Sequence, residues 1–207
     1  MSLFLKKEWK EGILGIWRMD ESWNELCHAI HNQALCQEAK SRFKALHRRI
    51  EWLSVRLLLQ ELLPYPTSIA YKPSGRPYLV NTPLHISISH TLGYVAVLLH
   101  QQPVGLDIEQ YGQRVHRITS RFIRNDEVIN PYLGEDTWSL LLHWSAKEAL
   151  FKYLDTEGVD FVNHLQVYPF IPQAEGSFKA QETKTEQKRT FTIQYLLCQD
   201  FVLTYTF

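Results

Sequence analysis

The fold is decided by residues 136 to 154, which read DTWSLLLHWSAKEALFKYL. This stretch contains neither Gly nor Pro and repeats apolar residues at helical spacing, so the sequence predicts a helix. On that helix, Trp144, Glu148 and Lys152 recur every four residues and share one face. A Glu–Lys pair at this spacing is commonly a plain surface ion pair, worth only about 0.2–0.5 kcal/mol. A second acidic segment upstream favours a functional interpretation.

That acidic segment is Gly105-Leu-Asp-Ile-Glu109, which alternates as a strand does. Residues two apart in a strand point to the same side, so Asp107 and Glu109 present their carboxylates together. Two like charges this close are unfavourable unless a cation lies between them, and an all-oxygen site suits Mg²⁺. Glu148 is a candidate third carboxylate, and Lys152 a candidate to neutralise phosphate charge. The acidic pair alone is equally typical of an exposed edge strand. The whole set predicts a Mg²⁺-dependent enzyme that acts on a phosphate ester or anhydride.

Basic residues in the first half of the chain are candidate phosphate ligands. Arg49 and Arg56 are seven apart on a helix predicted from Gln37 to Leu63, so they share one face. Guanidinium groups bind phosphate in a bidentate fashion, although helix arginines taken alone more often form a solvated face. The other candidates are Lys72 and Arg76, in a turn-rich loop fixed by two prolines, and Ser89 and His90, at the end of a strand.

Alternating apolar and polar residues predict the remaining strands. A short helix near Glu21–His31, with Asp20 as its N-cap, precedes the long helix that Pro64 ends. Short connections between the middle strands predict an antiparallel meander, and the polar segment Gln173–Arg189 predicts an exposed loop or a floppy hairpin. Each half combines helices with strands, which indicates an α+β fold of two similar lobes. The predicted strands are Ile13–Met19, His85–His90, Gly93–His100, Val104–Glu109, Leu165–Phe170, Thr190–Leu197 and Phe201–Phe207.

Composition argues against several classes of protein. The chain has 207 residues, with 22 Lys plus Arg balanced by 22 Asp plus Glu, so bulk charge indicates neither nucleic acid nor membrane as a partner. No apolar run reaches transmembrane length, and the start lacks a signal-peptide core. The three cysteines are scattered and odd in number, and His28 and His31 have no third ligand at a recognisable spacing. We therefore expect a cytoplasmic globular protein without a zinc site or a disulfide framework.

Four segments in order resemble the motifs of the 4′-phosphopantetheinyl transferases. The resemblance is to the longer, pseudo-dimeric (surfactin-synthetase-activating) type, in total length as well as in spacing. It implies two α+β lobes, residues 1–101 and 102–207, related by a pseudo-two-fold axis. Each lobe would be a small antiparallel sheet packed with helices, with coenzyme A and Mg²⁺ in the cleft between the lobes. The segments are Lys72-Pro-Ser-Gly-Arg-Pro77, Ile86-Ser-Ile-Ser-His90, Gly105-Leu-Asp-Ile-Glu109 and Trp144-Ser-Ala-Lys-Glu-Ala-Leu-Phe-Lys152.

The family resemblance also implies a reaction and a role for each matching residue. The 4′-phosphopantetheine of coenzyme A would pass to a serine of an acyl or peptidyl carrier protein, releasing adenosine 3′,5′-bisphosphate. Glu148 would also accept the serine proton, directly or through water. Fatty acid, polyketide and peptide synthesis and lysine metabolism all remain open as pathways. The implied Mg²⁺ ligands are Asp107, Glu109 and Glu148; the implied coenzyme A ligands are Lys152 and His90 on the pyrophosphate, Ser89, Arg49 and Arg56 on the 3′-phosphate, and Lys72 and Arg76 near the adenosine.

A basic stripe follows the acidic strand. Between Tyr111 and Asn125 there are four arginines and no acidic residue, at spacings that place them within about an 80° arc of an α-helix. We predict that this stripe docks the acidic helix of the carrier protein, and that the enzyme is a monomer. A metal-dependent nuclease and a non-catalytic coenzyme A or carrier-protein-binding module are the alternatives. The four arginines are Arg114, Arg117, Arg121 and Arg124.

Overall fold

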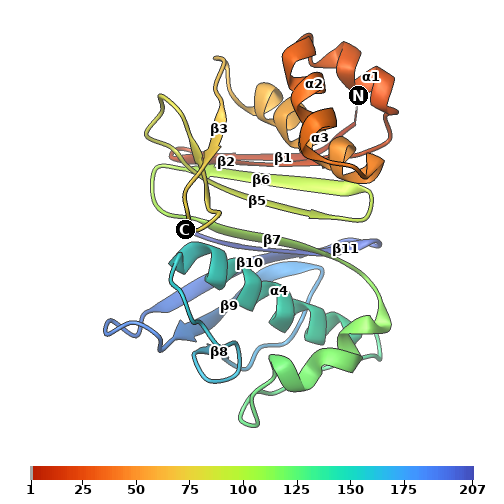
Figure 1. Cartoon of the computed structure of the whole chain (residues 1–207). Helices are drawn as coiled ribbons and strands as arrows, with labels where there is room; N and C mark the ends of the chain where they lie inside the picture. Colours follow the sequence, from red (N-terminus) through yellow and green to blue (C-terminus); the bar gives the residue numbers. More distant parts are fainter. Residues whose placement is uncertain (1) are drawn as a thin grey trace. The chain divides into compact units, whose positions relative to one another are not determined.

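The computed structural model describes residues 2–207 and divides into two compact units, which we call unit 1 (Met1–Gln102) and unit 2 (Pro103–Phe207). Both units combine helices with sheets whose strand pairs are all antiparallel (Figure 1). The predicted α+β fold class is confirmed. The two-fold relation between lobes stays a prediction.

Unit 1 is a four-stranded sheet in the order β1-β2-β6-β5, with three helices and a small β3–β4 hairpin. Helix α3 packs on β2 and β6 through leucines. A Cβ on Gly15 of β2 would lie 2.8 Å from side-chain carbons of Leu58 and Leu62, so a larger residue there would require these two leucine side chains to shift. The elements are β1 (Leu3–Trp9), β2 (Gly12–Arg18), α1 (Trp23–Ala29), α2 (Gln33–Arg42), α3 (Leu46–Leu62), β3 (Ile69–Tyr71), β4 (Pro77–Leu79), β5 (His85–Thr91) and β6 (Tyr94–His100).

Two predictions about the helices of unit 1 were wrong. The single helix predicted from Gln37 to Leu63 is two helices, because the chain turns extended at Phe43 and Ala45 between α2 and α3. Helix α1 is capped by Ser22 and not by Asp20: the Ser22 hydroxyl accepts from the backbone of Glu25, whose side chain accepts from the backbone of Ser22. This reciprocal capping box satisfies two amide groups at the start of the helix.

Unit 2 is a five-stranded sheet in the order β7-β11-β10-β9-β8, covered by α4 (Figure 1). Helix α4 (Thr137–Leu154) confirms the helix predicted from residues 136 to 154. A Cβ on Gly105 would lie 1.9 Å from the carbonyl oxygen of Ala149, so only glycine lets β7 approach α4 this closely. The strands are β7 (Gly105–Gln110), β8 (Leu165–Val167), β9 (Glu175–Glu182), β10 (Thr190–Leu197) and β11 (Phe201–Thr206).

Three predictions about unit 2 need correction. Strand β7 does not continue a meander from β6; it pairs with β11, with Asp107 opposite Thr204. The polar segment Gln173–Arg189 contains an ordered strand, β9, which hydrogen-bonds along β10. The segment after β7 is a 3₁₀ helix, η1 (Gln113–Arg121), and not an α-helix. Within residues 2–207, no helix is both long enough and apolar enough to cross a membrane.

Candidate active site

The predicted acidic site forms where α4 crosses β7 in unit 2. Lys152 places its Nζ 2.7 Å from Oδ1 of Asp107. About two turns earlier on the same face of α4, the indole Nε1 of Trp144 donates to Oε1 of Glu109 at 2.8 Å. Glu148 stands between Trp144 and Lys152 on the same helix face. Two adjacent elements therefore bring three acids, one cation and one indole donor together.

Burial and a neighbouring negative charge raise the pKa values of Glu148 and Glu109. Burial, followed by the charge of Asp107, raises the pKa of Glu148 to about 7, while Lys152 opposes the rise. Burial and Asp107 also raise the pKa of Glu109, against the hydrogen bond from Trp144. Glu148 can therefore gain or lose a proton near neutral pH, as a general base requires.

The carboxylate oxygens of the site are suitable ligands for the predicted Mg²⁺. Carboxylate oxygens are the ligands that Mg²⁺ prefers, and the mutual repulsion of these acids is the charge arrangement that a bound cation would relieve. Among residues 2–207, however, no three His, Cys, Asp or Glu side chains already form a metal-binding group, and the ammonium of Lys152 is the cation beside Asp107. The ligand atoms are therefore of the chemical type that Mg²⁺ prefers.

A buried ion pair behind the acids fixes α4 to the loops of unit 2. The side chains of Lys147 and Glu127 are both fully buried, with Nζ 2.8 Å from the Glu127 carboxylate. Lys147 also donates to the backbone carbonyls of Phe122 and Phe161. Glu127 in turn accepts from the backbone N–H of Val167 at 2.7 Å. This network anchors the turn of α4 that carries Glu148.

In unit 1, Arg48 and not Arg49 lies beside His90. Nη1 of Arg48 is 3.0 Å from Nε2 of His90 and 2.6 Å from Oε2 of Glu51. Arg49 instead donates through Nε to the carbonyl of Phe43 at 2.7 Å. His90 therefore belongs to a group with Arg48 and Glu51, at the start of α3 and the end of β5.

Arg56 is more deeply placed than the sequence predicted. It is only 9% exposed, with its guanidinium carbon 3.1 Å from the ring centroid of Trp52. Burial lowers the pKa of Arg56 to about 10, and Tyr71 opposes that shift. Among residues 2–207 no carboxylate lies within ion-pair distance of Arg56. A buried cation without a carboxylate partner is suited to an anionic ligand.

The remaining candidates of unit 1 lie on the β3–β4 turn and on β5. The backbone N–H of Lys72 donates to the carbonyl of Arg76 at 2.9 Å, which closes the turn. Burial, followed by the charges of Arg76 and Lys72, lowers the pKa of His85, so both cations act on the first residue of β5. Ser89 is buried in the same strand, next to His90.

A family model described as the 4′-phosphopantetheinyl transferase superfamily matches residues 103–206, half of the chain and nearly all of unit 2. The chain belongs to this superfamily. The predicted family is thereby confirmed, and the protein is a transferase of phosphopantetheine in the general sense, in a superfamily whose co-substrate is coenzyme A. A comparison with curated protein sequences finds no match, so the assignment rests on the family model.

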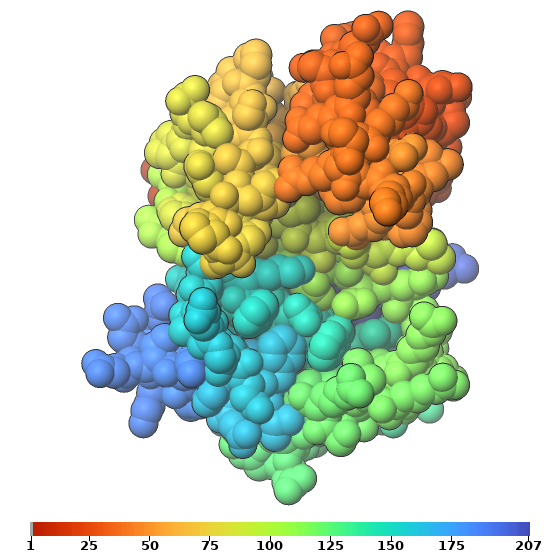
Figure 2. Space-filling view, in the orientation of Figure 1, coloured from red at the N-terminus to blue at the C-terminus, as the bar shows by residue number. Residues whose placement is uncertain are grey.

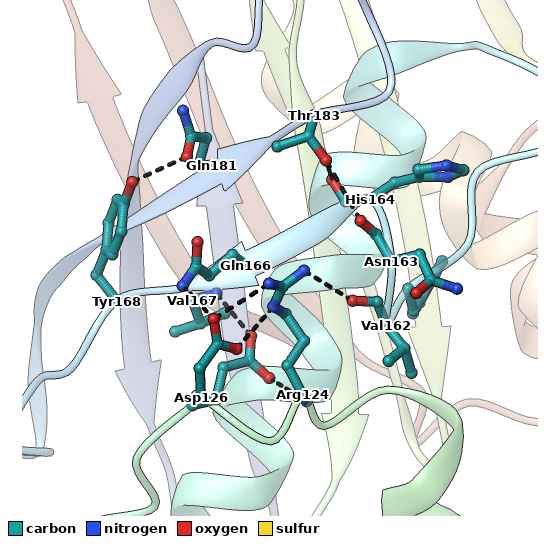
Figure 3. Close-up of polar contacts among 12 residues, drawn as sticks. Arg124, Asp126, Val162, Asn163, His164, Gln166, Val167, Tyr168, Gln181 and Thr183 are labelled. Carbon is teal, nitrogen blue, oxygen red and sulfur yellow. Dashed lines mark hydrogen bonds and ion pairs between the residues drawn. The ribbon is translucent and has the colours of Figure 1, made fainter.

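The transferase presents only part of the predicted arginine stripe. Arg114, Arg117 and Arg121 lie on η1 and are exposed, on a segment that forms a broad part of the surface of unit 2 in Figure 2 (green). Arg124 lies beyond η1, and its guanidinium pairs with Asp126 and donates to the carbonyl of Val162 (Figure 3). The 3₁₀ geometry also rotates Arg121 away from the first two arginines, because seven residues at three per turn end about 120° off. The stripe is therefore shorter and less regular than predicted.

The sequence did not predict a role for two residues of the transferase, Lys147 and Glu51. Lys147 is part of the Trp-Ser-Ala-Lys-Glu motif, three residues after Trp144. Its position on a helix rich in apolar residues was the signal that it could be buried. Glu51 follows Arg48 by three residues on α3, a spacing that brings side chains together.

Proposed function

We propose that this transferase moves the 4′-phosphopantetheine of coenzyme A to a serine of an acyl or peptidyl carrier protein, in a Mg²⁺-dependent reaction. The observation that carries the proposal is the arrangement of Asp107, Glu109, Glu148 and Lys152 within the segment that matches the superfamily. The products would be the holo carrier protein and adenosine 3′,5′-bisphosphate.

Glu148 acts as the base in this proposal. The serine oxygen forms a bond to the phosphorus that carries the pantetheine, the bond from that phosphorus to the nucleotide breaks, and the serine proton passes to Glu148, directly or through water. Burial and the charge of Asp107 raise the pKa of Glu148 to about 7, which makes its carboxylate a stronger base than that of an exposed glutamate. Lys152, one turn along α4, stabilises the negative charge that develops on the phosphoryl oxygens.

Asp107, Glu109 and Glu148 are the residues that would hold Mg²⁺. When bound, the ion would neutralise the charge of the pyrophosphate. The hydrogen bond from Trp144 fixes one oxygen of Glu109, and the ion pair with Lys152 fixes one oxygen of Asp107. These two contacts hold the acids in place before any ligand arrives.

Unit 1 supplies the side chains that bind phosphate in this proposal. His90 and Arg48 are exposed and meet at the start of α3, so we assign a phosphate of coenzyme A to them. Arg56 is a buried cation without a carboxylate partner among the described residues, and it supports binding of a second negative group. Ser89, Lys72 and Arg76 complete the set for the nucleotide end of coenzyme A.

The carrier protein is proposed to dock on Arg114, Arg117 and Arg121. All three are exposed, and none forms an ion pair among the described residues. An acidic helix is the complementary partner. Three cysteines without a disulfide are in keeping with action in the cytoplasm, and we expect a monomer.

Intact-mass spectrometry tests the proposal. Apo carrier protein incubated with the enzyme, coenzyme A and Mg²⁺ should gain the mass of one phosphopantetheine, and a carrier in which the acceptor serine is alanine should gain none. Asp107→Ala is the matched inactive enzyme, with a rate lower by on the order of 10³-fold. An unmodified carrier across fatty acid, polyketide and peptide-synthesis types would contradict the proposal.

A further inference from the structure

The phosphate-binding group of unit 1 already contains an anion. Glu51 Oε2 lies 2.6 Å from Nη1 of Arg48 and 3.9 Å from Nδ1 of His90. The Glu51 side chain is 17% exposed and that of Arg48 is 45% exposed, so the carboxylate sits on the inner side of a cation that faces solvent. Arg48, Glu51 and His90 form what we call the Arg48 triad.

The hydrogen bonds of this triad fix its charge. A guanidinium only donates, so Nε2 of His90 accepts from Arg48 and carries no proton. The imidazole in this arrangement is neutral, with its proton on Nδ1, the nitrogen nearer to Glu51. The triad as a whole then has one positive and one negative charge, and its net charge is zero.

The same contacts leave part of Arg48 available to a ligand. Both N–H groups of Nη1 are engaged, one by Glu51 and one by His90. Within residues 2–207, no protein group is hydrogen-bonded to Nε or Nη2 of Arg48. These two nitrogens form one edge of the guanidinium, the geometry that binds phosphate in a bidentate fashion. A phosphate at that edge would lie close to the negative charge of Glu51.

We infer that Glu51 is an internal counter-anion that opposes phosphate binding at Arg48 and thereby limits the affinity for coenzyme A and for the product nucleotide. The inference rests on the proposed function, because it takes the Arg48 triad as a coenzyme A subsite. Its consequence for turnover is that the site releases adenosine 3′,5′-bisphosphate readily, since Glu51 restores neutrality to Arg48 once the phosphate leaves. Affinity is thus held below the maximum that the cations alone would give.

The test is direct binding to the full chain, measured by calorimetry without carrier protein. Glu51→Gln keeps the shape of the side chain and removes its charge, so the Kd values for coenzyme A and for adenosine 3′,5′-bisphosphate should both fall, by about two- to fivefold, the range of an exposed ion pair. Glu61→Gln, an exposed acid on the same helix, is the matched control and should leave both values unchanged. In steady-state assays Glu51→Gln should lower the KM for coenzyme A and strengthen inhibition by the product in the same proportion.

A second pair of variants separates the counter-anion role from a merely structural one. In an Arg48→Gln background, Glu51→Gln should no longer tighten binding, because the cation through which it acts is gone. Weaker or unchanged binding in Glu51→Gln alone would overturn the inference and make Glu51 a residue that only positions Arg48. If the unaltered protein gives no binding signal with coenzyme A, the proposed function fails and the inference with it, which is a different result from binding that Glu51 does not affect.

Discussion

Helices α3 and α4 hold similar places in the two units but carry opposite charges. Each is a long helix, of 17 and 18 residues, packed on an antiparallel sheet. The candidate functional residues of α3 and its neighbouring strand are the basic side chains of Arg48, Arg56 and His90. Those of α4 and its neighbouring strand are mainly acids, with Lys152 as their counter-charge. One architecture thus offers a candidate phosphate-binding group in unit 1 and a candidate metal and base site in unit 2.

The two units also differ in how far the family model covers them. The family model matches unit 2, where the acids and Lys152 lie, and leaves the cations of unit 1 outside the match. Within unit 1 even the charge pattern is mixed, since Glu51 balances Arg48. The acids and Lys152 are therefore the part of the candidate site that lies within the family match.

The largest expected effect is on the stability of the protein and comes from a buried ion pair on α4. Lys147→Met removes a buried cation and leaves Glu127 buried without its partner, which should lower the free energy of unfolding by about 3–5 kcal/mol. Urea denaturation measures the change. Lys188→Met removes an exposed lysine of the same unit and should change stability little. Equal effects of the two variants would mean that the buried pair does not anchor α4.

A smaller effect is expected from the cations of unit 1. His90→Ala removes a charge-assisted contact worth roughly 1.5–3 kcal/mol, so the KM for coenzyme A should rise by roughly 10- to 150-fold while kcat changes less. Dephospho-coenzyme A, which lacks the 3′-phosphate, should also be a poorer donor than coenzyme A. A loss confined to kcat would instead place His90 with the reacting groups, and the two units would no longer divide the work as described.

The smallest effect concerns the carrier protein. Arg117→Glu combined with Arg121→Glu reverses two exposed charges, so the KM for the carrier should rise severalfold. The carrier KM should also depend less on salt concentration, and the KM for coenzyme A should stay unchanged. Lys188→Glu, elsewhere on unit 2, is the control. An unchanged carrier KM in the double variant would show that η1 is not the docking face.

The sequence predicted where the helix and strands of unit 2 lie in the chain better than it predicted which strands pair with each other. Helical periodicity located α4, and strand-like patterns located β7, β10 and β11, although only β10 alternates clearly between buried and exposed positions. Periodicity carries no information on strand pairing, so the pairing of β7 with β11 could not be read from it. The break at Phe43–Ala45 was missed because those residues include no Gly or Pro.

The site was predicted as a set of residues but not as a set of contacts. Trp144, Glu148 and Lys152 follow from helix spacing, and Asp107 and Glu109 from strand spacing. Which polar side chains meet depends on how side chains from different elements are placed, as in the contact of Arg48 with His90. The burial of Lys147 and Arg56 was also hidden, since charged residues are seldom placed in a core without knowledge of their partners.

The most direct test of the account compares Glu148→Gln with Glu157→Gln, an exposed acid of the same unit, in a single turnover followed by intact mass of the carrier protein. If Glu148 takes the serine proton, Glu148→Gln should slow transfer by on the order of 10³-fold while the Kd for coenzyme A changes far less. Glu157→Gln should load the carrier at the unaltered rate. Loading by Glu148→Gln at that same rate, in the presence of Mg²⁺, would contradict the account and remove Glu148 from the reaction.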